Sequence, residues 1–434
     1  MMYIDNILFA IILVIGIGFF AKNIKKLKRN IKLGHDVNRK DNPSARWKNM
    51  AMIALGQSKM VKRPVAGFLH IIVYAGFIII NIEVLEIIID GLIGTHRVLS
   101  FLGRFYGFLI GSFEILAVLV LVAVIIFWIR RNIIRLKRFA SSDLKGAPKR
   151  DADIILYFEI VLMSLFLIMN ATDLHFQEMK SGNIISQYIH PWFSSLDIAQ
   201  IEAVELVAWW FHIIGILIFL NYLYYSKHLH ILLAFPNTYF ADLNAKGKFD
   251  NLESVTKEVK LIMDPNADPF ASQAIDENAV PSKFGASDVQ DLNWVQLLNA
   301  YTCTECGRCT SSCPANQTGK KLSPRKIMMD TRDRMEEIGK NIDANKGVFV
   351  PDNKSLLNDY ITAEELWACT SCNACVEECP VNISPLSIIM DMRRYLVMEQ
   401  SAAPQSLNAM MTNIENNGAP WQYNQQDRLN WKNE

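Results

Sequence analysis

Five long apolar segments occupy the first half of this 434-residue chain, and they constrain its fold more than any other feature. The segments cover residues 7–21, 65–89, 106–129, 154–171 and 206–225. Apolar runs of about 18 or more residues can cross the hydrocarbon core of a bilayer as helices. The mean hydropathy of +0.15 is also high for a soluble protein of this length. We therefore expect a five-span membrane domain over residues 1–235.

The charges between these segments predict an orientation. Loops 22–63 and 130–150 carry thirteen and eight Lys or Arg, whereas the two other connections together hold only three. Because basic loops stay in the cytoplasm, we predict a multi-pass protein of the cytoplasmic (inner) membrane. Its N-terminus lies outside, the first segment is an uncleaved span, and everything after Tyr225 is cytoplasmic. A net charge of +1 excludes a generally nucleic-acid-binding surface.

All eight cysteines fall in two copies of the pattern C-x2-C-x2-C-x3-C-P, at residues 303–314 and 369–380. This is the spacing of two-cluster ferredoxins, in which the fourth cysteine of each motif ligates the other cluster. Two zinc sites are the alternative, but zinc knuckles do not duplicate the x3-C-P closure. Cysteines confined to two such clusters also exclude a secreted disulfide scaffold. The predicted ligands of two [4Fe–4S] clusters are, for cluster I, Cys303, Cys306, Cys309 and Cys379, and, for cluster II, Cys369, Cys372, Cys375 and Cys313.

The sequence around the two motifs predicts helices. Residues 323–340 begin with Ser-Pro and are rich in Met, Arg, Asp and Glu, and residues 384–399 form a second such segment. The chain is therefore predicted to be all-α, with a cytoplasmic α-helical ferredoxin domain over residues 291–434. It is similar in this to the iron–sulfur subunits of succinate dehydrogenase and heterodisulfide reductase. Residues 236–290 are polar and proline-containing and predict a linker, with one short helix at 252–263.

Four histidines lie in or at the ends of the apolar segments. His70 is near the cytoplasmic end of the second, His212 in the outer half of the fifth, and His228 and His230 at its cytoplasmic end. A histidine buried in lipid is costly, so each is a functional hypothesis. On one continuous helix, positions 212 and 230 share a face about 27 Å apart. The other four are expected at the surface: His35, His96, His175 and His190.

On this argument His70 and His230 lie level on different helices. Two neutral imidazoles on facing helices are what axial ligation of a b-type haem requires. An interhelical hydrogen bond is the alternative role for either histidine. We predict one haem ligated by His70 and His230, with His228 and His212 as rival ligands.

Residues 212–230 resemble the last span of the nitrate reductase gamma subunit. That family has five spans and two histidines at the same spacing. The resemblance implies two b haems, with two further histidines ten residues apart on the second span. His70 matches the first of these, but Ile80 stands at the second and cannot ligate iron. The resemblance therefore supports the haem between His70 and His230 and leaves a second haem without one ligand.

Two glutamates, Glu83 and Glu86, share a face near the outer end of the second segment, at a depth similar to that of His212. Two carboxylates and an imidazole in an apolar setting are suited to exchanging protons with a quinone. We therefore predict a quinone site at these three residues. A simple position at the membrane interface is the alternative for the glutamates.

Taken whole, the chain resembles membrane-bound heterodisulfide-reductase-like and electron-transfer-flavoprotein-linked iron–sulfur oxidoreductases. The likeness includes residues 55–57 (Leu-Gly-Gln), residues 63–64 (Arg-Pro) ahead of His70, and residues 300–303 (Ala-Tyr-Thr-Cys). Those proteins usually continue into two cysteine-rich CCG domains, whereas no cysteine follows Cys379 here. The resemblance implies a separate cytoplasmic partner, either a CCG-domain subunit or a flavoprotein.

These features together predict an electron-transfer subunit rather than a complete enzyme. The chain has no P-loop and no G-x-G-x-x-G fingerprint, so we expect neither a nucleotide nor a flavin site in it. The prediction is a quinone-linked oxidoreductase subunit that passes electrons between its cytoplasmic partner and the quinone pool, with the cofactors supplying the redox chemistry. Two alternatives are a redox-sensing or structural membrane anchor and a subunit of a heterodisulfide (thiol–disulfide) reductase.

Overall fold

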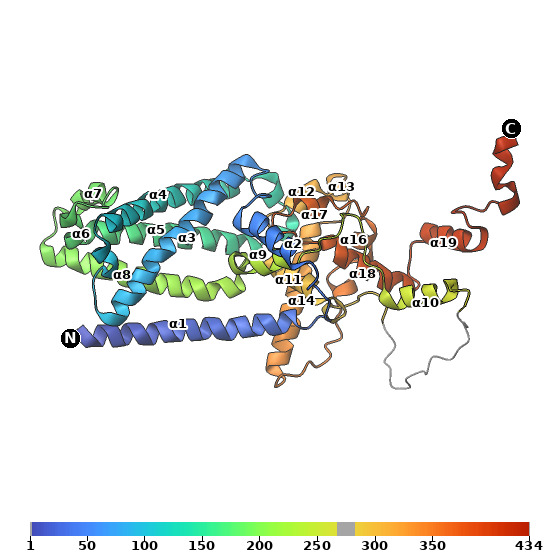
Figure 1. Cartoon of the computed structure of the whole chain (residues 1–434), viewed down its shortest axis with the longest axis horizontal. Coiled ribbons are helices and arrows are strands. Elements are labelled where there is room, and N and C mark those ends of the chain that lie inside the picture. Colours follow the sequence, from blue (N-terminus) through green and yellow to red (C-terminus); the bar gives the residue numbers. More distant parts are fainter. Residues whose placement is uncertain (1, 267–282, 434) are drawn as a thin grey trace.

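The computed structural model describes residues 2–266 and 283–433 (Figure 1). Helices make up its regular structure, and no strand occurs within these two ranges. An elongated bundle of long helices forms one part of the molecule, and a group of shorter helices from the second half of the chain packs against one end of it (Figure 1). The all-α prediction is therefore confirmed.

Five long helices form the bundle. Each is long and apolar enough to cross a membrane. Their packing follows the chain, because α4 contacts α3 and α5, and α8 contacts α5 and α1. The helices are α1 (Met2–Ile31), α3 (Pro64–Ile93), α4 (Arg104–Asn132), α5 (Ala147–Thr172) and α8 (Ile198–Tyr222).

The bundle buries one set of apolar side chains and exposes another. Phe113, Ala117 and Phe166 are fully buried, whereas Val14 and Phe108 are largely exposed. Exposed apolar side chains distributed along long helices are expected of a surface that faces lipid rather than water. The helices extend beyond the predicted apolar segments because polar residues, such as the basic end of α1, continue the same helices.

The fifth span does not continue as one helix to His230, so the expectation of a single helical face from position 212 to position 230 is wrong. After α8, a 3-10 turn leads to Ser226, whose backbone is extended (φ −116°, ψ 149°). The Ser226 hydroxyl accepts a hydrogen bond from the His228 amide at 3.0 Å, and Asp151 accepts one from the Lys227 amide at 3.1 Å. These two acceptors satisfy the backbone donors that the interruption frees. A new helix, α9 (His230–Tyr239), then begins at His230 itself.

The second half of the chain is built on three helices: α11 (Trp294–Thr302), α14 (Pro324–Ala344) and α18 (Pro385–Met398). Ser323 and Ser384 cap α14 and α18, and each is followed by a proline at the first helical position, which suits its fixed backbone angle. The helices predicted at 323–340 and 384–399 are thus present. The helix predicted at 252–263 is α10 (Glu253–Met263).

Short helices complete the described structure. They are α2 (Pro43–Met50), α6 (Leu174–Met179), α7 (Ser186–Ile189), α12 (Arg308–Ser312), α13 (Pro314–Gln317), α15 (Leu356–Asp359), α16 (Ala363–Trp367), α17 (Ala374–Glu378) and α19 (Gln405–Asn417).

Parts of the basic loop and of the predicted linker belong to the core of the second half. Asn30, at the end of α1, donates a hydrogen bond to the Tyr301 hydroxyl at 2.8 Å. The His35 amide bonds to the Leu292 carbonyl at 2.9 Å. Residues 283–290 also pack there, and Val289 is fully buried. The part of the predicted linker at 267–282 lies outside the described residues.

Candidate functional site

The two cysteine motifs lie side by side, because α12 of the first packs against α17 of the second. One cavity is lined by Cys303, Cys306 and Cys309 of the first motif together with Cys379, the last cysteine of the second, and Cys375 of the second motif also reaches it. The structure therefore brings together the four side chains predicted to hold cluster I.

The other four cysteines also lie together. Burial raises the pKa of the Cys375 thiol to about 12, and the neighbouring thiols of Cys369, Cys313 and Cys372 contribute to the same shift. This group includes Cys313, the last cysteine of the first motif, so it corresponds to the predicted cluster II set. Among these four, Cys372 is exposed to solvent.

The two motifs repeat one backbone conformation. Glu305 and Ser371, each two residues after the first cysteine, have left-handed φ values of 54° and 57°. Gly307 and Asn373, each directly after the second cysteine, do the same at 71° and 60°. Left-handed residues turn the chain tightly enough for three cysteines to surround a small space. At Gly307 a Cβ atom would also lie 2.6 Å from an Arg325 nitrogen, so the position has no room for a side chain.

Backbone amides point at the cysteine sulfurs. The Ser371 amide lies 3.4 Å from Cys369 Sγ, and the Ile383 amide lies 3.3 Å from Cys379 Sγ. Such donors stabilise the negative charge of metal-bound thiolates and tune the reduction potential of iron–sulfur clusters.

The first motif is attached to the segment that leads into α3. Arg308 is buried and donates hydrogen bonds to the carbonyls of Lys59 at 3.1 Å and Met60 at 3.2 Å. Lys59 in turn lies 3.3 Å from the Cys379 carbonyl, and Arg63 pairs with Glu378 at 3.1 Å. The basic residues before the second span therefore contact both motifs directly.

A buried ion pair attaches the same motif to the interruption after α8. Glu305 is almost fully buried and pairs with Lys227 and, at 2.9 Å, with Arg332. Burial raises the pKa of Glu305, but the two cations outweigh it, and the net pKa lies below its usual value. Lys227 directly precedes His228, so the cluster loops and these histidines are held together.

His70 and His230 face each other between α3 and the start of α9. Their ring centroids are 6.4 Å apart, with planes inclined by 42°. Two imidazoles that bind one metal from opposite sides, with bonds of about 2 Å, have centroids about 6 Å apart. His230 Nδ1 lies 3.1 Å from the Lys227 carbonyl, which leaves Nε2 free. His70 Nδ1 is buried and has no hydrogen-bond partner within the described ranges.

His228 lies beside this pair but is oriented differently. Its ring centroid is 5.5 Å from that of His230, nearly perpendicular to it, and 5.4 Å from that of Phe219. Burial lowers the pKa of His228 to about 3 and also lowers that of His230, so both imidazoles are neutral. Neutral imidazole is the form that ligates metals.

The two predicted glutamates lie inside the bundle at its other end. Glu83 and Glu86 are both buried. Glu86 accepts hydrogen bonds from the Tyr106 hydroxyl at 3.1 Å and the Leu99 amide at 2.9 Å. Glu83 Oε2 has no partner among the residues described. Glu83 is therefore the carboxylate left available for a ligand.

His212 is buried as well, but no hydrogen bond within the described structure joins it to either glutamate. Its ring centroid lies 6.2 Å from that of Phe166, and its Nδ1 has no partner in the described part of the chain. The structure thus groups Glu83 with Glu86 and leaves His212 on a separate contact between α8 and α5.

Through Tyr106, Glu86 belongs to a larger polar network that sequence reasoning missed. Arg97, expected in an outer loop, is buried and donates to Asp173 at 2.6 Å and Asn170 at 2.8 Å. Its guanidinium also lies 4.1 Å from the Phe176 ring centroid. The sequence did contain one indication of this role, because Arg97 is one of only three basic residues in the two outer connections.

Two further glutamates within the spans were also missed. Glu114 is fully buried and accepts hydrogen bonds from Asn170 and from the amides of Ile185 and Ser186. Glu159 lies within α5, and no hydrogen bond to it is found among the described residues. Acidic residues within membrane spans are rare, so each interrupts an apolar run visibly.

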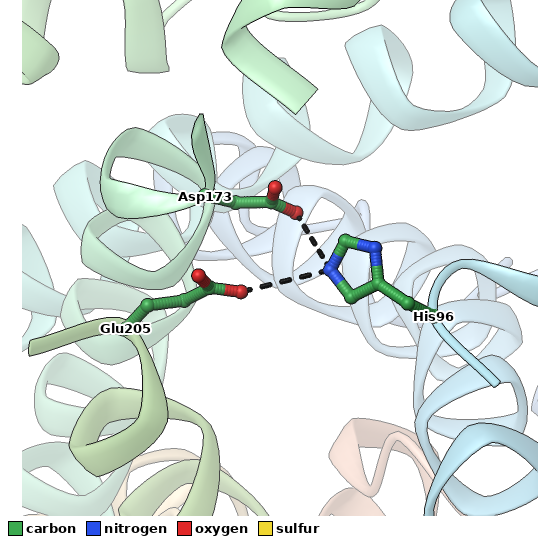
Figure 2. A group of neighbouring side chains, drawn as sticks. All are labelled: His96, Asp173 and Glu205. Atoms are coloured by element: carbon green, nitrogen blue, oxygen red, sulfur yellow. Dashed lines mark ion pairs between the residues drawn. The ribbon is translucent and has the colours of Figure 1, made fainter. Parts of the chain in front are cut away.

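His96 lies at the rim of the network and pairs with two carboxylates (Figure 2). Its Nε2 lies 3.3 Å from Asp173 Oδ2 and 3.6 Å from Glu205 Oε1. Pairing with the carboxylates of Asp173 and Glu205 raises the pKa of His96 to about 9. His96 is half exposed, as expected, but it is not an isolated surface residue.

Residues 302–383 match the family model described as a 4Fe-4S dicluster domain. The matched region contains both cysteine motifs, and the predicted ferredoxin character of this part of the chain is confirmed.

Curated relatives extend the likeness over the whole chain. It is 31% identical to the "Probable iron-sulfur-binding oxidoreductase FadF" of Bacillus subtilis, over 99% of this chain and 61% of that protein. It is 24% identical to the "EtfAB:quinone oxidoreductase" of Syntrophomonas wolfei, over 98% and 59% of the two chains. A "Probable membrane-anchored ferredoxin" of Chromohalobacter salexigens is 33% identical over 37% of this chain and 26% of its own length. No solved structure matches.

These relatives confirm the resemblance to heterodisulfide-reductase-like and electron-transfer-flavoprotein-linked iron–sulfur oxidoreductases, since shorter matches include heterodisulfide reductase subunits C and D. The chain spans about three fifths of the two curated relatives that match it throughout. It combines five helices that are long and apolar enough to cross a membrane with a region that matches an iron–sulfur domain.

A buried arginine next to the Cys303 cavity supports this domain from the bundle side. Arg325 lines the cavity and is 1% exposed. It pairs with Asp143, in the loop between α4 and α5, at 3.0 and 2.6 Å. Because the Arg325 guanidinium is removed from water, the folded state depends on the Asp143 carboxylate to compensate its charge.

Replacing Asp143→Ala is expected to lower the free energy of unfolding by roughly 3–5 kcal/mol, because it leaves a buried cation unpaired. The matched control is Glu364→Ala, whose partner Lys321 is 73% exposed, and its expected cost is about 0–1 kcal/mol. Denaturant unfolding of the purified protein measures both. Equal effects of the two substitutions would contradict the role given to the Arg325 pair.

Proposed function

We propose that this chain is the membrane electron-transfer subunit of a quinone-linked oxidoreductase, passing electrons between a soluble redox partner and the quinone pool. The observation that carries the proposal is the direct contact between the cluster loops and the entrance to α3. Arg308, between Cys306 and Cys309, holds the backbone of Lys59 and Met60, and His70 follows within three turns. The candidate cofactor sites are therefore adjacent in one molecule.

The cysteine sets support two [4Fe–4S] clusters with crossed ligation, as the motif spacing predicts. We assign Cys303, Cys306, Cys309 and Cys379 to cluster I, and Cys369, Cys372, Cys375 and Cys313 to cluster II. When bound, the clusters and a haem supply one-electron redox chemistry. Because Cys372 is exposed, the cluster II set faces the soluble partner, and the cluster I set, next to Arg308, faces the membrane bundle.

We assign His70 and His230 as the ligands of one b-type haem. Three observations support this pair: the 6.4 Å separation of the rings, the buried unpartnered Nδ1 of His70, and the hydrogen bond that orients His230 through its Nδ1. His228 is less suitable, because its ring is perpendicular to that of His230 and packs against Phe219. His212 lies within α8, 18 residues before His230, and packs against Phe166.

We place the quinone site at Glu83, with Glu86 as its neighbour. The buried, unpartnered oxygen of Glu83 can accept or release a proton, whereas Glu86 is held by Tyr106 and the Leu99 amide. His212 remains a candidate on its own contact with Phe166. The likeness to the EtfAB:quinone oxidoreductase of Syntrophomonas wolfei supports both the quinone and an electron-transfer-flavoprotein partner.

The orientation follows from charge. We place the cysteine region in the cytoplasm and the network around Arg97 at the outer side of the cytoplasmic membrane, because the basic loops lie at the cysteine end. The partner is then a cytoplasmic flavoprotein or CCG-domain subunit. A role within a heterodisulfide-type reductase is the second candidate, favoured by the matches to heterodisulfide reductase subunits.

Crossed ligation predicts which cysteines share a cluster. The purified protein should contain about eight iron atoms per chain in two cubane clusters. Cys379→Ser is expected to perturb the same electron paramagnetic resonance signal as Cys303→Ser, because both thiolates would serve cluster I. Cys369→Ser should perturb the other signal. If Cys379→Ser reproduces the spectrum of Cys369→Ser, the assignment is wrong.

The haem assignment predicts that His70→Ala loses the b-type absorbance of the reduced protein while both iron–sulfur signals remain. The reason is that His70 is the histidine of α3 that lies opposite His230, so its loss removes one of the two axial ligands. His35→Ala, which removes an exposed imidazole near the same end of the bundle, is the control and should keep full haem content. Unchanged haem in His70→Ala, or none in the unmodified protein, would exclude the assignment.

The quinone assignment predicts that Glu83→Gln slows reduction of the cofactors by a quinol analogue by roughly 10²-fold, because a positioned proton acceptor is lost. Reduction by dithionite should be unaffected. Glu178→Gln removes an exposed carboxylate at the same end of the bundle and should react at the normal rate. A normal rate in Glu83→Gln together with a slow rate in His212→Ala would move the site to His212.

A further inference from the structure

Three side chains with metal-binding atoms meet at the end of the bundle remote from the cysteines (Figure 2). His96 comes from the connection between α3 and α4, Asp173 from the junction of α5 and α6, and Glu205 from α8. One donor atom from each lies within 4.8 Å of the other two. None of these residues takes part in the haem, cluster or quinone sites proposed above.

We propose that His96, Asp173 and Glu205 form a binding site for a zinc-type divalent cation at this end of the molecule. Zn²⁺ is bound by imidazole nitrogen and carboxylate oxygen at about 2 Å in a tetrahedron, which places neighbouring ligand atoms about 3.3 Å apart. His96 Nε2 lies 3.3 Å from Asp173 Oδ2 and 3.6 Å from Glu205 Oε1. Two of the three donor pairs therefore already have nearly the spacing that the ion requires, and the third pair lies within 4.8 Å.

The chemistry of the donors selects the type of cation. An imidazole among carboxylates suits Zn²⁺ and similar transition metals, whereas Ca²⁺ and Mg²⁺ prefer oxygen ligands alone. The site also has access to solution, because His96 is 54% exposed and Glu205 is 24% exposed. An ion can therefore reach it without opening the bundle.

Asp173 is held in place by contacts behind it. Its Oδ1 accepts the Phe176 amide at 2.9 Å, and its Oδ2 accepts Arg97 Nε at 2.6 Å. Arg97 is itself fixed by Asn170. Such outer contacts orient a ligand before the metal binds and reduce the ordering that binding requires.

Charge at the site favours a cation despite Arg97. Two carboxylates, Asp173 and Glu205, outweigh the single guanidinium when His96 is neutral, so the donor set keeps a net negative charge. In the absence of metal, a protonated His96 bridges the same two carboxylates, and Zn²⁺ takes the place of that proton. The proton on His96 and the metal ion are thus alternative occupants of the space between the imidazole and the two carboxylates.

A fourth ligand is available nearby. The exposed ring of His175 has its centroid 5.8 Å from that of His96. His175 is the second residue of α6, the helix that Asp173 caps. A rotation of this surface side chain, or a water molecule, completes a four-coordinate site. The bound ion joins the α3–α4 connection to α5 and α8, so it cross-links three spans at their outer ends.

The test uses the full chain purified in detergent with its cofactors. After equilibration with Zn²⁺ and removal of unbound metal, about one zinc per chain is expected by mass spectrometry. His96→Ala and Glu205→Gln should each lose it. Glu202→Gln removes an exposed carboxylate one turn away on α8 and should retain it.

X-ray absorption at the zinc edge identifies the ligands, and it should show nitrogen and oxygen neighbours without sulfur. Zn²⁺ should also raise the unfolding temperature of the unmodified chain and of Glu202→Gln but not of Glu205→Gln. Equal zinc content in all variants, a sulfur shell from the cysteines, or no zinc in the unmodified chain would each overturn the proposal. If His96→Ala fails to fold, Glu205→Gln alone decides, because its side chain is partly exposed and nearly isosteric.

Discussion

Buried arginines hold the cysteine region against the helical bundle, and the arrangement of the candidate cluster and haem sites depends on them. Arg308 donates to the carbonyls of Lys59 and Met60, and Arg325 donates to the Arg138 carbonyl and to Asp143. Arginine suits this role because its planar guanidinium offers five donors to several carbonyls and carboxylates at once. Each such residue satisfies loop backbone that the spans leave unpaired, and so it fixes the loops of the bundle against the cysteine motifs.

The cysteine groups and the helical class could be predicted because they depend on local spacing. A repeated C-x2-C-x2-C-x3-C-P pattern dictates which thiols meet, and the structure groups Cys379 with the first motif and Cys313 with the second. The interruption at Ser226 could not be predicted, because the groups that satisfy it include Asp151, far away in sequence. His70 and His230 nevertheless came together, although the helical-face argument for His230 failed.

The buried network at the other end shows a second limit. Sequence reasoning found Glu83 and Glu86 because acidic residues stand out in an apolar run. It missed Arg97, whose partners Asp173 and Asn170 lie more than 70 residues away, and only the packing of α5 against the α3–α4 connection reveals them. Buried charges in a low-dielectric interior persist when they are paired and hydrogen-bonded, and this network meets that condition except at Glu83.

The interruption after α8 also determines what the two imidazoles belong to. His70 is part of a span, whereas His230 begins α9, which packs against α11, the helix that leads into Cys303. The imidazole opposite His70 is thus carried by a helix that packs against the cysteine region and not by one of the five long helices. The separation of the two rings therefore depends on how the cysteine region packs against the bundle, and a fragment ending at Tyr222 would retain all five long helices yet lack one of the two imidazoles.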